Sequence, residues 1–255
     1  MLSLSPIKLN TSRAGNLRDL RPLPGRRNAL LRWLLPLTLL ALVLLWTAPQ
    51  IFGSIPKTLT ESRLTGPRSP APVGIVLLLD ESGSFSGYGP IREKALEELS
   101  QWAPKNLRKD DTVTVISFAG DADTKMSMTT VEELALQGPL YRQVTLQTGG
   151  TSIQPALQKA LAETSGSKPT SVIAVTDTEV DDADPSAAME LMRKLNVTTM
   201  TTLVPSDGTV QDTWESAFGW SLILKADAGS PGQTALAIGK ALSHATGQKL
   251  EAQNR

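Results

Sequence analysis

Five oxygen-bearing side chains stand at positions from which they could share one ligand. Asp80, Ser82 and Ser84 form the pattern D-x-S-x-S directly after an apolar run. Alternate residues of a chain that leaves a strand can turn the same way, so these three side chains could face one point. Thr151 stands just before a predicted helix, and Asp177 follows another apolar run. Because functional groups of open α/β sheets gather beyond the carboxyl ends of the strands, we expect all five at one sheet edge.

These residue types indicate a site for a hard metal ion. Carboxylate and hydroxyl oxygens are suited to Mg²⁺, with Mn²⁺ or Ca²⁺ as alternatives, rather than to soft metals. Only two of the five side chains are anionic, so a divalent ion held by them is barely neutralised. It keeps affinity for one more anionic oxygen from outside. The set therefore predicts a receptor for an Asp or Glu side chain of a partner protein.

The elements that must position this set alternate between strand and helix patterns. Apolar or β-branched runs predict strands over 73–79, 112–118, 125–130, 171–176, 197–204 and 221–224, with 125–130 as an edge strand. Apolar residues at helical spacing predict helices over 90–102, 153–164, 185–195 and 234–245. Strands interleaved with helices are typical of an α/β fold with a mostly parallel sheet between two helical layers.

With these motifs in place, residues 73–247 resemble a von Willebrand factor type A domain with its metal-ion-dependent adhesion site. The five positions carry the family's residue types in the family's order. The resemblance implies a doubly wound sheet with one short antiparallel edge strand. It also implies that Ser82, Ser84 and often Thr151 touch the metal, whereas Asp80 and Asp177 act through water. The family commonly has Gly where this chain has Thr178. Since Thr resists the positive φ that Gly permits, a different shape of this loop is one expectation.

Composition excludes several classes of function. Lys plus Arg and Asp plus Glu both number 25, but residues 1–32 hold seven of the basic groups and only one acid, Asp19. The remainder is acidic, which argues against nucleic-acid binding by the globular part. The absence of Cys excludes disulfides and thiolate chemistry, and a single His, His244, excludes a multi-histidine zinc site. The serine motif G-x-S-x-G is absent around Ser82. We therefore expect no enzyme.

The chain before residue 73 predicts a membrane anchor. Residues 33–52 contain the apolar run WLLPLTLLALVLLW and no charge, long enough for a transmembrane helix that contacts the lipid bilayer. Its long basic lead and the lack of an A-x-A-like exit favour a retained single-pass anchor over a signal peptide. The basic head, residues 1–32, is expected to be disordered and cytoplasmic. Residues 53–72 are rich in Pro and Ser and predict an extended linker, and residues 248–255 a tail.

These segments predict a plasma-membrane protein, loosely of bacterial type, whose domain lies outside and serves adhesion or complex assembly. A scaffold with a purely structural metal remains an alternative, and a metal-dependent hydrolase is a weaker one because no general base stands near the site. The acidic run 179–184 has two interpretations. We interpret it as a solvated turn in which Asp184 caps the next helix, with a second calcium loop as the alternative.

Overall fold

A computed structural model describes residues 56–253 except 148, 183 and 228. The predicted cytoplasmic head and the predicted transmembrane helix over 33–52 lie outside the described residues. Within the described part of the chain, none of the helices combines the length and the apolar character that crossing a membrane requires.

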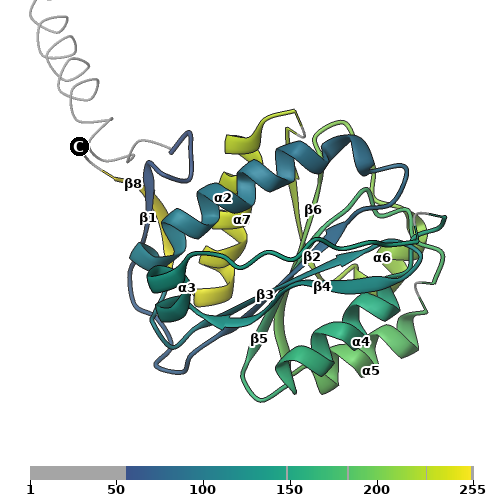
Figure 1. The fold of residues 1–255 in the computed structure, drawn as a ribbon, viewed down its shortest axis with the longest axis horizontal. Helices are drawn as coiled ribbons and strands as arrows, with labels where there is room; N and C mark the ends of the chain where they lie inside the picture. Colours follow the sequence, from purple (N-terminus) through teal and green to yellow (C-terminus); the bar gives the residue numbers. More distant parts are fainter. Residues whose placement is uncertain (1–55, 148, 183, 228, 254–255) are drawn as a thin grey trace, which may run out of the picture. The chain divides into compact units, whose positions relative to one another are not determined.

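A six-stranded sheet forms the centre of the domain (Figure 1). Its strands are β2 (Gly74–Asp80), β3 (Thr112–Phe118), β4 (Ala122–Thr130), β5 (Thr170–Val175), β6 (Val197–Pro205) and β7 (Leu222–Ala226). Their order across the sheet is β4-β3-β2-β5-β6-β7, and only β4 runs antiparallel to its neighbour. The predicted mostly parallel α/β sheet with an antiparallel edge is confirmed.

Helices cover both faces of this sheet (Figure 1). They are α2 (Gly89–Asn106), α3 (Val131–Gln137), α4 (Ile153–Thr164), α5 (Pro185–Lys194), α6 (Asp212–Phe218) and α7 (Pro231–Thr246), with a short 3₁₀ helix η1 (Ser86–Tyr88). Side chains of β2 alternate between the two layers: Leu77 packs with α2, α3 and α7, whereas Leu78 packs with α4, α5 and α6. Every residue of β2, β3 and β5 is buried, which explains their apolar and β-branched composition.

The predicted linker and tail differ from the structure. Residues 62–65 form strand β1 (Ser62–Thr65), which pairs antiparallel with β8 (Lys249–Ala252). Just before β1, the side chain of Leu59 is completely buried against α7, where a Cβ on Gly239 would collide with it. The Trp102 indole also donates to the Ser62 carbonyl at 2.8 Å. Because these contacts are long-range, composition alone predicted a free linker where the chain in fact completes the domain.

Leu59→Ala tests this correction. Removing a fully buried Leu side chain leaves a cavity, so we expect a loss of about 2–4 kcal/mol in the free energy of unfolding, measured by urea denaturation. Leu136→Ala is the matched control, because Leu136 is 79% exposed and should change stability by less than about 0.5 kcal/mol. Equal stability of the two variants would show that residues before β1 lie outside the folded unit.

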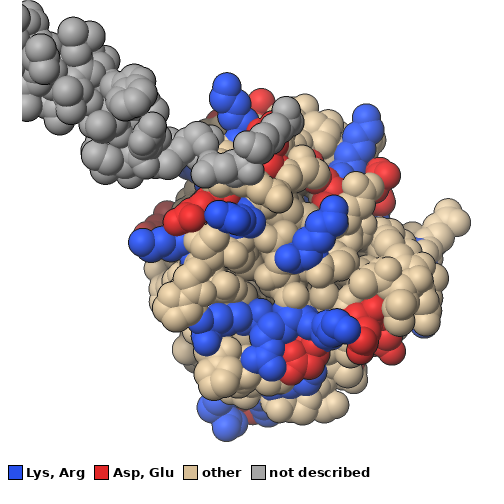
Figure 2. Space-filling view, turned by 90° about the vertical axis from the view of Figure 1, so that its left-hand side faces the viewer, with Lys and Arg blue, Asp and Glu red and all other residues tan. Residues whose placement is uncertain are grey.

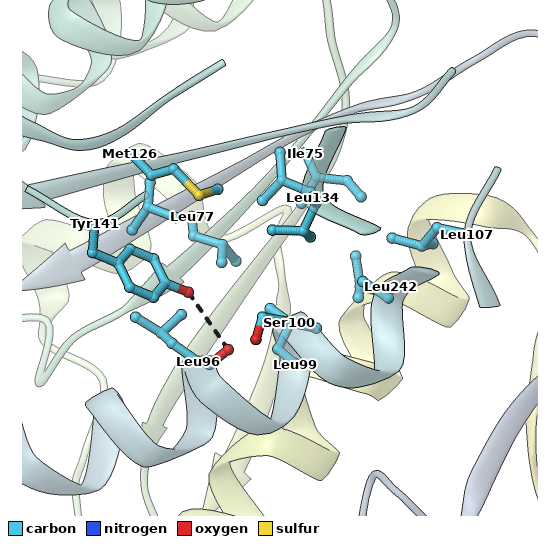
Figure 3. A pocket seen from close by; sticks show the side chains of 13 residues that line it. Ile75, Leu77, Leu96, Leu99, Ser100, Leu107, Met126, Leu134, Tyr141 and Leu242 are labelled. Carbon is cyan, nitrogen blue, oxygen red and sulfur yellow. Dashed lines mark hydrogen bonds between the residues drawn. The ribbon is translucent and has the colours of Figure 1, made fainter. Parts of the chain in front are cut away.

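The chain that follows α3 packs against the apolar side chains between α2 and the sheet (Figure 3). Tyr141, in the irregular chain that follows α3, points its hydroxyl toward the Leu96 carbonyl of α2, 3.5 Å away. Burial raises the pKa of the Tyr141 hydroxyl, with a smaller contribution from the negative charge of Glu93. The space left among these side chains is about 20 Å³, room for one water at most. It is therefore a packing defect of the core and too small for an organic ligand.

Candidate functional site

Asp80 ends the central strand β2 and is fully buried. Its carboxylate accepts two hydrogen bonds, one to each oxygen: from the Ser82 amide at 2.9 Å and from the Thr176 hydroxyl at 2.7 Å. Burial raises the pKa of Asp80, the hydrogen bonds from Ser82 and Thr176 oppose the rise, and the nearby charge of Asp177 adds to it. Asp80 is therefore a buried acid that ties the end of β2 to the end of β5.

The hydroxyls of Ser82 and Ser84 lie 3.2 Å apart, as expected for alternate residues of one loop. Together with Thr151, which comes from the loop before α4, they line an open polar depression of about 420 Å³. Ser82 and Thr151 are themselves buried, whereas Ser84 is exposed. Two loops almost 70 residues apart in the sequence thus bring three of the five predicted oxygens to one hollow.

Asp177 lies beside this group rather than in the wall of the depression. It directly follows Thr176, whose hydroxyl binds Asp80, and its charge is close enough to affect the pKa of Asp80. One oxygen of the half-buried Asp177 carboxylate accepts the Glu179 amide at 3.1 Å. The structure therefore brings Asp80 and Asp177 together below and beside the three hydroxyls.

The acidic run after Asp177 is mostly exposed, as predicted for a solvated turn, and it also holds the neighbouring loops in place. Asp181 accepts the Thr151 amide at 2.9 Å, and the Asp181 amide donates back to the Thr151 carbonyl at 2.8 Å. The two oxygens of Asp182 accept the amides of Ile153 and Gln154, so Asp182 caps the first turn of α4. These carboxylates are engaged by backbone amides, which does not favour the alternative of a second calcium loop.

The prediction that Asp184 caps the next helix is confirmed. Asp184 precedes Pro185 and accepts the Ser186 amide at 2.8 Å, which makes it the N-cap of α5.

Thr178 adopts the left-handed backbone conformation, with φ at +68°. The expectation of a different loop shape is therefore wrong in this respect, because the Thr takes the conformation that a Gly would favour. Its hydroxyl accepts the Gln211 amide at 3.0 Å and donates to the Thr209 carbonyl at 3.4 Å. These bonds connect the Asp177 loop to the loop before α6, and they offset the strain of a β-branched residue at positive φ.

Substitutions at Thr178 separate strain from hydrogen bonding. Thr178→Gly removes strain of about 1–2 kcal/mol but leaves the Gln211 amide without its acceptor, so the two effects nearly cancel. Thr178→Val keeps the branched shape and loses the hydroxyl. Both variants lack the hydroxyl, so Thr178→Val, which keeps the strain, should be less stable than Thr178→Gly by about 1–2 kcal/mol in chemical denaturation. Equal stability of Thr178→Val and wild type would show that the hydroxyl has no structural role.

A buried ion-pair network, which the sequence pattern did not indicate, supports the D-x-S-x-S loop. Glu81 binds the Arg92 guanidinium at 2.5 Å and lies 3.8 Å from the Lys125 ammonium, which also contacts Glu93. Arg92 donates to the Phe85 carbonyl at 3.3 Å and stacks over the Phe85 ring at 4.9 Å. Arg92 thus holds the residues on both sides of the two serines. No spacing signal links α2 and β4 to this loop, which is why the network escaped prediction.

The loops around the site are strongly acidic. Residues 81–88, 119–121, 147–152, 176–184 and 206–211 contain no Lys or Arg, and they hold several Asp and Glu side chains. The negative potential of such an edge raises the local concentration of cations. Among the described residues, no three His, Cys, Asp or Glu side chains form a metal cluster of their own. The candidate donor set instead combines two carboxylates with three hydroxyls, and this hard-oxygen chemistry fits a divalent ion of the Mg²⁺ type.

Comparison with known proteins identifies the domain. Residues 75–179 match the family model of the von Willebrand factor type A domain. The match confirms a von Willebrand factor type A domain in this chain, in agreement with the observed sheet order. Domains of this type commonly bind protein partners, and they often hold a divalent metal at the adhesion site. No curated protein matches the sequence.

Solved structures share the fold at low sequence identity. Proximal thread matrix protein 1 from the mussel byssus has 16% identity over 68% of this chain and 48% of that protein, with a TM-score of 0.51. A second structure of it, described as having a zinc-occupied adhesion-site motif, has 18% identity over 69% and 48%, also at 0.51. BatB from Bacteroides thetaiotaomicron has 17% identity over 68% and 98%, at 0.45. The chain thus spans about half the length of the mussel protein.

Proposed function

We propose that this domain binds a divalent cation, Mg²⁺ or alternatively Mn²⁺ or Ca²⁺, and uses it to capture a carboxylate of a partner protein. The observation that carries the proposal is the shared depression lined by the hydroxyls of Ser82, Ser84 and Thr151, backed by the buried Asp80. Asp80 and Asp177 supply the negative charge, and the three hydroxyls supply neutral ligands. The bound ion would provide an electrophilic centre for one oxygen from a partner.

The shape and charge of the site support capture of a partner. The depression opens to solvent beside Ser82 and Ser84, so a partner's Asp or Glu side chain can approach the hydroxyls. Glu179 and Asp181 also line it, and they would repel an acidic partner in the absence of a cation. Binding of an acidic side chain is therefore expected to depend strictly on the metal.

A binding role fits this edge better than catalysis. The chain's one histidine, His244, lies in the last turn of α7, at the sheet edge opposite the depression. We propose no enzymatic activity. The proposal includes the single-pass anchor over residues 33–52, with the cytoplasmic head before it and the domain outside the plasma membrane, where adhesion or complex assembly would take place.

Affinity capture with the full chain tests the proposed function. Wild-type protein in detergent is incubated with a membrane extract of its source cells, once with Mg²⁺ and once with a chelator. We expect specific partners to be retained only with Mg²⁺ and only by wild type, not by Asp80→Asn. Retention of the same partners in chelator by a folded protein would instead favour the scaffold alternative with a structural metal.

A further inference from the structure

Charge is separated between the two edges of the sheet. The edge that carries the depression has no Lys or Arg in its loops, as described above. The opposite edge, which includes β1, β8 and the end of α2, carries the exposed cations Arg63, Lys105 and Lys249. Figure 2 shows this side of the molecule, with Lys and Arg spread over it and Asp and Glu beside several of them. We call the surface formed by β1, β8 and the last turn of α2 the basic pole.

The three cations of the basic pole are available to an external ligand. None of them takes part in the ion pairs found among the described residues, in contrast to Arg68, which pairs with the buried Asp111. Glu251 stands opposite Arg63 in the β1–β8 register, but the two form no ion pair. Exposed cations that lie outside these ion pairs attract anions in solution or on a surface.

A hollow within the basic pole has the lining of an anion site. It measures about 280 Å³ and lies between β1 and the C-terminal end of α2. Arg63, Lys105, Gln101 and Gln253 line it, and the Glu98 carboxylate accepts the amide of Thr60, which also lines it. Two cations and two amide side chains outweigh this one carboxylate, so the hollow favours a phosphate group.

The sequence connects the domain to the predicted anchor by a short segment. Only ten residues separate Trp46, at the end of the apolar run, from Lys57, where the chain enters the domain. A fully extended chain covers at most about 3.6 Å per residue, so the reach between them is limited to roughly 40 Å. A domain tethered this closely and charged this unevenly would turn its basic side toward an anionic membrane surface.

We propose that the basic pole lies on a bilayer with anionic lipid headgroups, and that the hollow between Arg63 and Lys105 receives a headgroup phosphate. The inference rests on the proposed anchor, which brings the bilayer within reach. Its consequence is orientation: the depression at the opposite edge then faces away from the membrane, toward a partner.

Energy transfer in reconstituted full-length protein tests the proposal. The chain has no Cys, so Ser69→Cys beside the pole and Ser206→Cys at the opposite edge each give a single labelling site. Each labelled protein is placed in phosphatidylcholine vesicles, with or without 30% phosphatidylglycerol, that carry a headgroup acceptor. We expect transfer from position 69 to increase with the anionic lipid and to exceed transfer from position 206. High salt should reverse the increase.

Charge variants assign the effect to the pole. Arg63→Gln, Lys105→Gln and Lys249→Gln, combined in one protein, should remove the increase at position 69. The matched control combines Lys94→Gln, Lys159→Gln and Lys225→Gln, which change the charge equally at other surfaces and should preserve it. Asp80→Asn should also preserve it, because the proposed metal site is independent of the pole. Equal transfer in both lipid mixtures, or equal loss in both triple variants, would overturn the proposal.

Flotation with vesicles tests the basic pole even if the anchor does not insert into the bilayer. The protein would then fail to float with phosphatidylcholine alone, but the basic pole still predicts flotation with phosphatidylglycerol present. Each cation near an anionic surface contributes roughly fivefold to binding, so the pole variant should bind about 100-fold more weakly. Absence of flotation with either lipid would refute both the anchor and the basic pole.

Discussion

Asp80→Asn is expected to weaken Mg²⁺ binding by about 10–100-fold while stabilising the metal-free domain. The affinity falls because the substitution removes one of the two carboxylates of the site. A carboxylate that acts on the metal through water still contributes to the affinity. The stability rises because Asp80 is fully buried, and burial of its charge is unfavourable without a cation. Asn can still accept the Ser82 amide, so the gain is expected to be about 1–3 kcal/mol.

Thermal unfolding with and without Mg²⁺ measures both effects. At a concentration 100 times the dissociation constant, the ion stabilises the wild type by about 2.7 kcal/mol, or roughly 5–10 °C in Tm for a domain of this size. In Asp80→Asn the same concentration should add no more than about 1–2 °C if the affinity falls 100-fold. An equal Mg²⁺ shift in both proteins would contradict the assignment of Asp80 to the metal site.

Acid titration provides a further test of Asp80. Its folded-state pKa lies above the ordinary value of 3.8, so the metal-free folded state binds a proton more tightly than the unfolded state. The stability cost of the charge is therefore complete above the raised pKa and disappears as the pH falls toward 3.8. The difference in stability between wild type and Asp80→Asn should narrow over that window. A constant difference across it would mean that the pKa of Asp80 is the same in the folded and unfolded states.

Arg92→Met is expected to produce a large loss of stability. Arg92 is 3% exposed, pairs with Glu81 at 2.5 Å and binds the Phe85 carbonyl. Met replaces the bulk of the stem but leaves the Glu81 carboxylate with only Lys125 as its cation. Removing one member of a buried pair costs about 3–5 kcal/mol, and the partial exposure of Glu81 reduces this to about 2–4 kcal/mol. Because Glu81 and Phe85 flank the two serines, Mg²⁺ affinity should fall as well.

Lys109→Met is the matched control for Arg92→Met. Lys109 also forms an ion pair, with Glu132 at 3.2 Å, but both side chains are more than half exposed. Exposed pairs contribute little, so urea denaturation should show a change below about 1 kcal/mol and an unaltered Mg²⁺ affinity. If Arg92→Met changed stability and Mg²⁺ affinity as little as Lys109→Met does, the ion-pair network would not support the D-x-S-x-S loop.

Sequence patterns predicted the central part of the fold well because burial imposes continuous apolar composition there. Strand β3 and helix α4 have the predicted bounds, since α4 lies between Ser152 and Ser165 and β3 lies between Asp111 and a turn that contains Gly120. The short helices α3 and α6 were not predicted. Thr130 and Glu133 form a capping box at the start of α3, a local signal that could have revealed it.

The edges of the domain were harder to predict because their order depends on distant partners. Strand β1 has four residues of mixed polarity and pairs with β8, almost 190 residues later. No pattern within residues 53–72 alone predicts that pairing. The same holds for Leu59, whose burial depends on the absence of a side chain at Gly239.

The candidate site shows the same division. The D-x-S-x-S spacing and the strand-end rule were enough to place Ser82, Ser84 and Thr151 around one depression. They could not indicate that Thr178 accepts a positive φ, because its compensating bonds come from residues 209–211. The charge network behind Glu81 likewise depends on contacts across elements. Spacing therefore predicts which side chains meet, whereas the support around them requires the fold.

The most direct test of the account is a titration of the full-length wild-type protein with Mn²⁺, followed by electron paramagnetic resonance of the free ion. The account predicts that one Mn²⁺ binds per chain, that Mg²⁺ displaces it, and that replacing both Ser82 and Ser84 with Ala removes this binding without unfolding the domain. Saturable binding that persists unchanged in the folded double variant, or no saturable binding to the wild type, would contradict it.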